Sequence, residues 1–155
     1  MSNVIIFVAN YLYLLPVALF IGYAFVTKRR KEFMLLSFLV LPTSYLLGVL
    51  AGHLFYDPRP FVVSHVPPLF PHAPDNGFPS DHALLTGTIA ALLTAFSVPL
   101  GLLMWFLAFL IGAARVIAGV HHALDIAGSF AIAGASTLVI RAFLKRFRQD
   151  EPNVV

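Results

Sequence analysis

The sequence contains no cysteine, and only 11% of its 155 residues are charged. The absence of cysteine excludes disulfide bridges and thiolate metal ligands. A soluble domain of this length needs far more polar surface to cover its core. Here 59% of the residues are hydrophobic and the mean hydropathy is +0.88. The composition therefore predicts a chain whose solvent is the lipid bilayer.

The formal net charge is +3, and most of the positive charge lies in two clusters. One is residues 28–31, and the other comprises the basic residues from Arg141 to Arg148. Each cluster adjoins a long apolar stretch, so we expect membrane-surface anchors and no nucleic-acid partner. The first apolar stretch is too long for a cleavable signal peptide and has its basic cluster at the wrong end. It is therefore expected to remain as a helix.

Five apolar stretches are long enough to cross a bilayer, which predicts an all-α fold, a polytopic transmembrane helix bundle. They run roughly over 4–27, 33–54, 81–98, 100–118 and 123–143. Because positive clusters favour the cytoplasm, we expect the N-terminus outside, the C-terminus in the cytoplasm and Pro99 in a cytoplasmic hairpin. The expected organisation is one multi-pass domain over 1–148 in the cell membrane, followed by a disordered tail over 149–155.

The segment 55–80 differs from the spans because seven prolines fall between Pro58 and Pro79. Proline removes a backbone donor and breaks helices, so no regular helix is expected here. The pair Asn76-Gly77 is typical of a turn. We expect an extracytoplasmic loop that is long enough to carry function.

Polar and ionisable residues gather at the outer ends of the predicted spans. They are Asp57, Arg59, Ser80, Asp81, His82, Arg115, His121, His122 and Asp125. Ionisable groups near the membrane are costly, and a functional role is their default interpretation. Simple anchors would be divided between both faces, so this convergence predicts a site at the outer face.

The chemistry of this set suits phosphate. Arg59 and Arg115 are permanent cations whose planar forks match phosphate oxygens. A helix that begins at Ser80 adds free backbone N–H groups and a positive dipole end. Simpler roles are open for each residue alone, since an arginine can anchor to lipid head groups and a serine can cap a helix.

Histidines provide the candidate reactive groups. His121 and Asp125 are four residues apart, so on a helix they share a face, and the carboxylate can orient the imidazole for nucleophilic attack. His82 can protonate the leaving oxygen. The pair can also exist only to neutralise itself near the membrane. His53, His65, His72 and His122 have no evident partner and are expected to be loop or interface residues.

Three motifs resemble those of the type 2 phosphatidic acid phosphatase superfamily, which shares its site with vanadium haloperoxidases. They are Arg59-Pro60, the run Pro-Ser-Asp-His over 79–82, and the run Arg-Val-Ile-Ala-Gly-Val-His-His-Ala-Leu-Asp over 115–125. Together they extend over about half of the chain, and the spacing within the third is specific.

The resemblance implies a role for each matching residue. His121 is the expected nucleophile and forms a phosphohistidine, Asp125 orients it, and His82 acts as general acid and then as base. The expected phosphate-binding residues are Arg59, Arg115, Ser80 and Gly119. Neither a metal nor a cofactor is required.

Three departures from the family pattern stand out. The first motif normally begins with a lysine, which falls at Gly52, and the neighbouring His53 is the expected stand-in for phosphate binding. Asp81 replaces the glycine of the second motif, and Ala114 replaces the serine before the third. Many members also have a sixth span.

The sequence around Asp81 resembles that of bacterial undecaprenyl-diphosphate phosphatases, which implies a lipid diphosphate substrate at the outer face. Phosphatidylglycerophosphate and phosphatidate are the alternative lipid substrates. A transporter would place charges through the span midplanes, which here are nearly free of them. A non-catalytic structural subunit is the third hypothesis, and the oligomeric state stays open.

Overall fold

The computed structural model describes residues 2–149, and within them the chain is helical with no strand. The helices are α1 Ser2–Tyr11, α2 Leu14–Val26, α3 Arg30–Leu54, α4 Pro60–Ser64, α5 Asp81–Thr94, α6 Val98–Ile117 and α7 Ala123–Gln149. The predicted all-α polytopic bundle is confirmed. In the described part, four segments are long and apolar enough to cross a membrane, namely Ser2–Val26, Arg30–Leu54, Val98–Ile117 and Ala123–Arg146.

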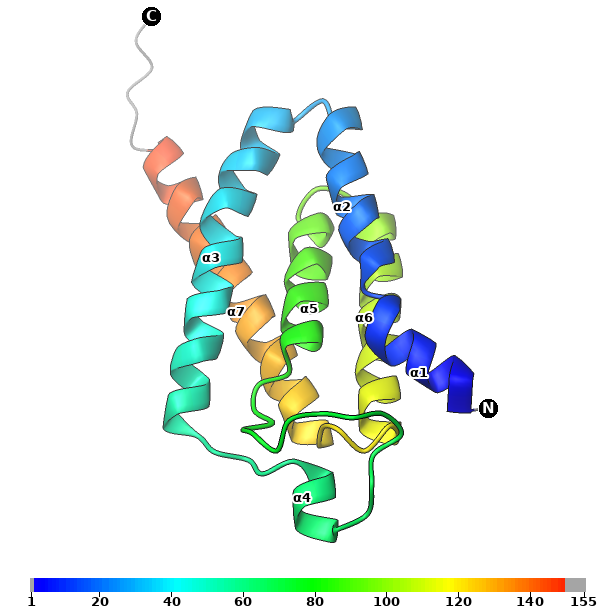
Figure 1. Ribbon diagram of the computed structural model, residues 1–155. Coiled ribbons are helices and arrows are strands. Elements are labelled where there is room, and N and C mark those ends of the chain that lie inside the picture. Colours follow the sequence, from blue (N-terminus) through cyan, green and yellow to red (C-terminus); the bar gives the residue numbers. More distant parts are fainter. Residues whose placement is uncertain (1, 150–155) are drawn as a thin grey trace, which may run out of the picture.

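The first predicted span is interrupted between α1 and α2, where the ribbon changes direction (Figure 1). Pro16 has no N–H to donate to the carbonyl of Leu12, so the regular ladder is broken at that point. The N–H of Leu15 bonds to the Leu12 carbonyl instead, at 3.0 Å. The single helix expected over 4–27 is therefore two helices, which together still form one candidate span.

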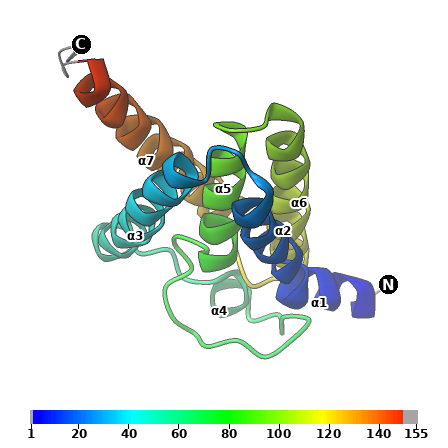
Figure 2. The same cartoon turned by 90° about the horizontal axis from the view of Figure 1, so that it is seen from above.

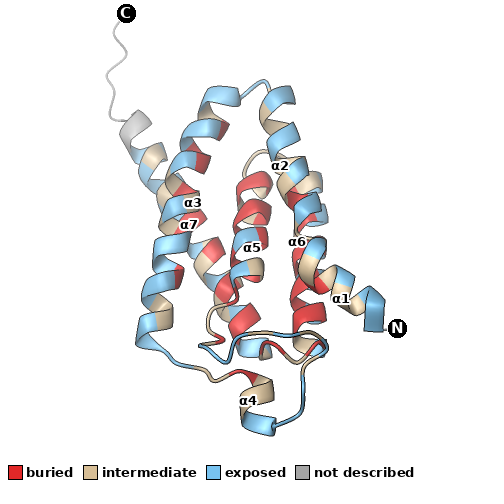
Figure 3. Cartoon of the chain, viewed as in Figure 1, coloured by how far each residue is buried: buried red, intermediate tan, exposed pale blue. Residues whose placement is uncertain are grey.

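Helix α5 is the centre of the bundle and packs against α2, α3, α6 and α7 (Figure 2). It is also the most deeply buried helix, whereas the outer faces of α2 and α3 are exposed (Figure 3).

The span expected up to 98 was too long, because α5 ends at Thr94 and the turn precedes Pro99 rather than containing it. Pro99 lies in the first turn of α6, where its missing N–H costs nothing.

The two ends of the bundle differ in chemistry. The turn between α2 and α3 and the C-terminal part of α7 lie at one end, while α4, the proline-rich loop and the α6–α7 turn lie at the other (Figure 1). Arg29, Arg141 and Lys145 line one small cavity, so the two basic clusters lie together. The expected tail falls outside the described residues except for Gln149, which ends α7.

The segment 55–80 contains one short helix, α4, which the proline pattern did not predict. It begins at Pro60, a position where proline is favoured. The side chain of Asn76 holds the loop to the end of α3. Its Oδ1 accepts the N–H groups of Asp57 (2.9 Å) and Phe78 (3.0 Å), and its Nδ2 donates to the carbonyls of Gly52 (2.8 Å) and Phe55 (3.0 Å). Asn76 therefore does more than form a turn.

Candidate active site

A cavity of about 520 Å³ lies at the loop end of the bundle. Its lining includes side chains from α3, the loop, α5, α6 and the α6–α7 turn. The polar members are Tyr45, His53, Arg59, His72, Asp75, Asn76, Asp81, His82, Arg115 and His121. The fold thus brings together predicted site residues that lie up to about sixty positions apart in the chain.

Arg59 is only 5% exposed, so its charge depends on partners supplied by the fold. Its Nε donates to Oδ1 of Asp75 at 2.7 Å, and its Nη2 donates to the carbonyl of Asn76 at 3.3 Å. Its Nη1 donates to the carbonyl of Val120 at 2.8 Å. The guanidinium is therefore held between the loop and the α6–α7 turn, with one face toward the cavity lining. The pKa of Asp75 is held below its usual range by Arg59, which outweighs the opposing effect of burial.

Arg115 is 3% exposed and is held from two other sides. Its Nη1 donates to the carbonyl of Ala9 in α1 at 3.0 Å, and its Nη2 lies 3.3 Å from Nε2 of His72. Its Nε is buried and has no hydrogen-bond partner among the described residues. An unsatisfied buried donor on a cation is costly, and an anion in the cavity would satisfy it.

His121 is buried beside Asp125 and Arg59. Its Nδ1 lies 3.2 Å from Oδ2 of Asp125, and its Nε2 lies 3.3 Å from Nη1 of Arg59. Arginine can only donate, so Nε2 is the acceptor and Nδ1 carries the proton that Asp125 accepts. Burial, assisted by Arg115 and Arg59, lowers the pKa of His121 below its usual value despite Asp125. A neutral imidazole with an unprotonated Nε2 is the form that a nucleophile requires.

The turn before α7 positions His121, rather than the helix that the four-residue spacing suggested. Helix α7 begins at Ala123, so His121 precedes it. Gly119 adopts φ +77°, a conformation that favours glycine, and allows the turn to reverse. The N–H of Leu69 also bonds to the carbonyl of Ala118 at 3.0 Å, which fastens the turn to the loop. Gly119 itself is not among the residues that line the cavity.

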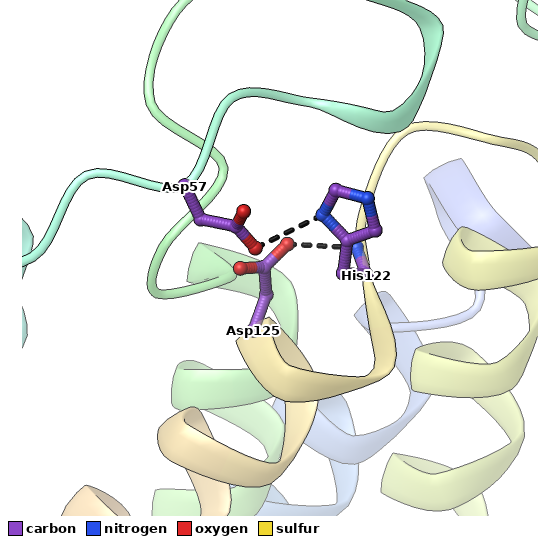
Figure 4. A group of neighbouring side chains, drawn as sticks. All are labelled: Asp57, His122 and Asp125. Atoms are coloured by element: carbon purple, nitrogen blue, oxygen red, sulfur yellow. Dashed lines mark hydrogen bonds and ion pairs between the residues drawn. The ribbon is translucent and has the colours of Figure 1, made fainter. Parts of the chain in front are cut away.

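Asp125 belongs to a second group, with Asp57 and His122 (Figure 4). Its Oδ2 accepts the backbone N–H of His122 at 2.8 Å, and Oδ2 of Asp57 lies 2.9 Å from Nδ1 of His122. His122 lies in the turn before α7, as expected of a loop residue, and Asp57 is the partner that the sequence did not reveal. The loop supplies that partner from 65 positions away, a distance over which no sequence spacing signals a contact.

Each of these three residues has an atom that could bind a metal ion, and the three atoms lie within 4.8 Å of one another. The carboxylate of Asp57 and the ring of His122 already bond to each other, and Oδ2 of Asp125 serves two donors. One carboxylate oxygen of Asp57 and one of Asp125 therefore have hydrogen-bond partners within the protein, without a metal ion. Oδ1 of Asp125 is buried and has no partner among the described residues.

Ser80 and His82 stand at the start of α5. Ser80 occupies the N-cap position, but its side chain makes no capping hydrogen bond, and its buried Oγ has no partner within residues 2–149. Its carbonyl accepts the hydroxyl of Ser129 at 3.0 Å, which fixes the start of α5 against α7. The ring of His82 lines the cavity and meets the ring of Tyr13 edge-on at 4.9 Å.

The position of the missing lysine is tightly packed. A Cβ on Gly52 would lie 3.0 Å from the carbonyl oxygen of Phe78, which is closer than ordinary contact, so a side chain there would press on the backbone of the loop. His53 lines the cavity, but its Nδ1 is bonded to the carbonyl of Val49 at 2.7 Å and the residue is exposed. His72 lies in the loop, as expected, and its side chain reaches Arg115, a contact that the sequence did not reveal.

An apolar groove adjoins the polar cavity. It has a volume of about 240 Å³ and lies between α3 and α5, where Leu41, Leu84 and Leu85 contribute to its lining. Tyr45, Asp81 and Leu84 line both spaces, so the groove and the cavity share a boundary. A molecule with a charged head and an apolar chain fits this arrangement.

Known proteins resemble this chain in sequence and in structure. Residues 32–149 match the PAP2 superfamily. The chain is 30% identical over 142 residues to the bacitracin transport permease protein BcrC of Bacillus licheniformis, which covers 90% of this chain and 70% of that protein. It is 34% identical over 79 residues to the undecaprenyl-diphosphatase BcrC of Bacillus subtilis, which covers 51% of this chain and 41% of that protein. The crystal structure of Aquifex aeolicus LpxE matches with a TM-score of 0.74 at 26% identity, over 90% of this chain and 86% of that one.

The match covers most of the chain, and the protein belongs to the PAP2 superfamily. It is a multi-pass membrane hydrolase, a lipid phosphatase.

Proposed function

We propose that this phosphatase hydrolyses undecaprenyl diphosphate to undecaprenyl phosphate at the outer face of the cell membrane, through a phosphohistidine on His121. The observation that carries the proposal is the hydrogen-bond chain from Asp125 through His121 to Arg59, at 3.2 Å and 3.3 Å. It leaves an unprotonated Nε2 beside a buried guanidinium at the cavity. This is the arrangement for attack on an anionic phosphorus.

The reaction proceeds in two displacements. Nε2 of His121 attacks the terminal phosphorus, the bond from phosphorus to the bridging oxygen breaks, and His82 gives its proton to that oxygen as lipid monophosphate leaves. Water then attacks the phosphohistidine, His82 takes a proton from the water, the P–N bond breaks and inorganic phosphate departs. Arg59, Arg115 and Ser80 hold the phosphate oxygens, and Asp125 stabilises the imidazolium character that develops on His121.

Two observations favour a lipid diphosphate. The apolar groove between α3 and α5 meets the cavity at Tyr45, Asp81 and Leu84, so it extends the site toward the hydrocarbon region. The Bacillus subtilis relative is named for undecaprenyl diphosphate. Phosphatidylglycerophosphate and phosphatidate share the same head-and-chain design and are the competing substrates.

The central test replaces His121 with alanine in detergent-purified protein. We expect phosphate release from undecaprenyl diphosphate to fall by about a thousandfold or more, as when a nucleophile is removed. Labelled terminal phosphate should become attached to the wild-type protein and not to His121→Ala. His65→Asn, an exposed change in the same loop end, is the matched control. Unchanged activity in His121→Ala would sink the mechanism.

Two further measurements define the substrate and the metal requirement. A panel of prenyl diphosphates of different chain length, phosphatidate and phosphatidylglycerophosphate should give the highest kcat/KM with the longest prenyl diphosphate. Activity should persist in EDTA, because the proposed steps use His121, His82 and the two arginines and need no metal ion. Loss in EDTA and recovery with a divalent cation would contradict this point.

A transport role is the second candidate, because the Bacillus licheniformis relative is named as a permease. A transporter needs polar groups along a path, yet the buried charges among the described residues are Arg59, Arg115, His121 and Asp125, all at one end. Uptake or export by proteoliposomes, with no phosphate release, would favour transport over hydrolysis.

A further inference from the structure

The proposed reaction does not use His72, although this side chain lines the cavity and touches Arg115. Nη2 of Arg115 lies 3.3 Å from its Nε2, and its Nδ1 lies 3.3 Å from the carbonyl of Ala73. Arginine only donates and a carbonyl only accepts. One tautomer satisfies both contacts, a neutral ring with its proton on Nδ1.

The surroundings of His72 favour that neutral form. Burial lowers the pKa of His72 below its usual value, and the nearby charges of Arg59 and Arg115 lower it further, against smaller opposing effects from the Ala73 carbonyl and Asp75. The titratable and charged groups that interact with the ring are Arg59, Arg115, Asp75, His82 and His121. Two of them are fixed cations, so a second positive charge on the ring is disfavoured.

The contact matters because Arg115 has few other partners. The carbonyl of Ala9 accepts from Nη1, and Nε has no partner in the described part of the chain. His72 is therefore one of two acceptors that set the orientation of this guanidinium. The ring of His72 also meets the ring of His121 edge-on at 6.2 Å, which places it beside the nucleophile.

We propose that His72 is a positioning residue, a neutral hydrogen-bond acceptor that holds the guanidinium of Arg115 toward the substrate phosphate. This inference rests on the proposed phosphatase function and adds a residue to it. It also adds an anchor to the proposed phosphate clamp of a chain that has Gly52 where the family pattern has a lysine. A protonated His72 cannot accept from Arg115 and repels it, so acidification should loosen the clamp.

The test compares His72→Ala, His72→Gln and the exposed-loop control His65→Asn, with thermal unfolding in detergent as a check on folding. Asparagine tolerates the left-handed conformation of His65, whose φ is 56°. His72→Ala should raise KM for the lipid diphosphate about tenfold or more at pH 7, the scale of one lost hydrogen bond to a charged group, with a smaller effect on kcat. His72→Gln retains an acceptor oxygen and should stay near wild type at pH 7.

The pH dependence separates this role from direct phosphate binding. Wild-type KM should rise as the pH falls from 7 to 5, and His72→Gln should lack that part of the rise because glutamine does not titrate. A His72-dependent fall in KM on acidification would overturn the proposal, since it means that an imidazolium binds the phosphate. Equal impairment of His72→Gln and His72→Ala at pH 7 would also overturn it.

Failure of this inference can be told from failure of the proposed function. If wild-type protein releases no phosphate from any lipid phosphate, the function itself fails. If the wild type is active and His72→Ala has the wild-type KM, the phosphatase function stands and the positioning role is rejected.

Discussion

At the residue scale, two influences on the proton of His121 oppose each other. Burial and the arginines favour the neutral ring, whereas the bond to Asp125 favours the imidazolium, and the balance lowers the pKa. A neutral nucleophile persists into mildly acidic solution when its pKa is low. In the proposed mechanism, the Asp125 carboxylate would support the charged ring during the reaction, while the surroundings keep the resting ring neutral.

This balance predicts the acid side of the pH profile. The inflection that His121 contributes to kcat/KM should lie below 6.5, the ordinary value for histidine. Asp125→Asn removes the influences that raise the pKa, so it should move the inflection to lower pH. It should also reduce kcat by about a hundredfold or more, because the orienting acceptor is lost. An inflection above 6.5, or a shift upward in Asp125→Asn, would contradict the geometry.

Gly52 gives a second prediction at this scale. Restoring the family lysine with Gly52→Lys should lower kcat/KM rather than raise it, because its Cβ would press on the Phe78 carbonyl and displace the loop that carries Asn76 and Asp75. Val66→Lys, an exposed change in the loop, is a control for added charge. A gain of activity in Gly52→Lys would show that the loop yields without cost.

At the scale of elements, the proline-rich loop is a fixed part of the site and not a loose connector. Its residues supply the bonds that hold Arg59 and Arg115, and the amide of Asn76 ties it to the C-terminal end of α3. One side chain with four backbone partners thus contributes much of the organisation of the loop.

Asn76→Ala should therefore destabilise the protein as well as the site. Leaving these backbone groups without their partner should lower the free energy of unfolding by about 2–4 kcal/mol. Thermal unfolding in detergent measures the change. Asn76→Asp keeps the acceptor for Asp57 and Phe78 but sets a carboxylate oxygen against the carbonyls of Gly52 and Phe55, so it should destabilise the protein as well. If the alanine variant melts like the wild type, the loop is held by other contacts.

The groove between α3 and α5 predicts a separation of lipid and soluble substrates. Leu85→Trp fills the groove away from the reactive histidines and should raise KM for the long-chain lipid diphosphate about tenfold. Hydrolysis of a small water-soluble phosphate ester should be unchanged, because it occupies only the polar cavity. Equal loss on both substrates would show that the groove does not bind the chain. Leu102→Trp, on the exposed side of α6, is the control.

At the scale of the whole molecule, the two basic clusters and the cavity lie at opposite ends (Figure 1). Positive charge is retained on the cytoplasmic side, so the cavity should face outward. The absence of cysteine makes this testable without background. In intact cells, a membrane-impermeant maleimide should label Val66→Cys, which is exposed in the loop, and should label Lys28→Cys only after the cells are opened. The reverse pattern would place the site in the cytoplasm.

The sequence by itself determined the membrane class, the helical bundle and some of the residues that line the polar cavity, namely His53, Arg59, His82, Arg115 and His121. Long apolar runs and isolated charges are local features of a sequence. They can be recognised without a structure because the bilayer strongly disfavours a misplaced charge. The sequence predicted the local backbone geometry less accurately. The break at Pro16, the short α5 and the turn that holds His121 each depend on how neighbouring helices pack.

Only the tertiary structure decided the partners within the site. Arg115 bonds to Ala9 from 106 positions away and to His72 from 43, and His122 pairs with Asp57 across 65. No period or motif links such residues, because each contact arises where a loop or turn folds across the end of the bundle. His72 and His122, which the sequence indicated only as loop or interface residues, belong to the site because the fold brings His72 beside Arg115 and His122 beside Asp57.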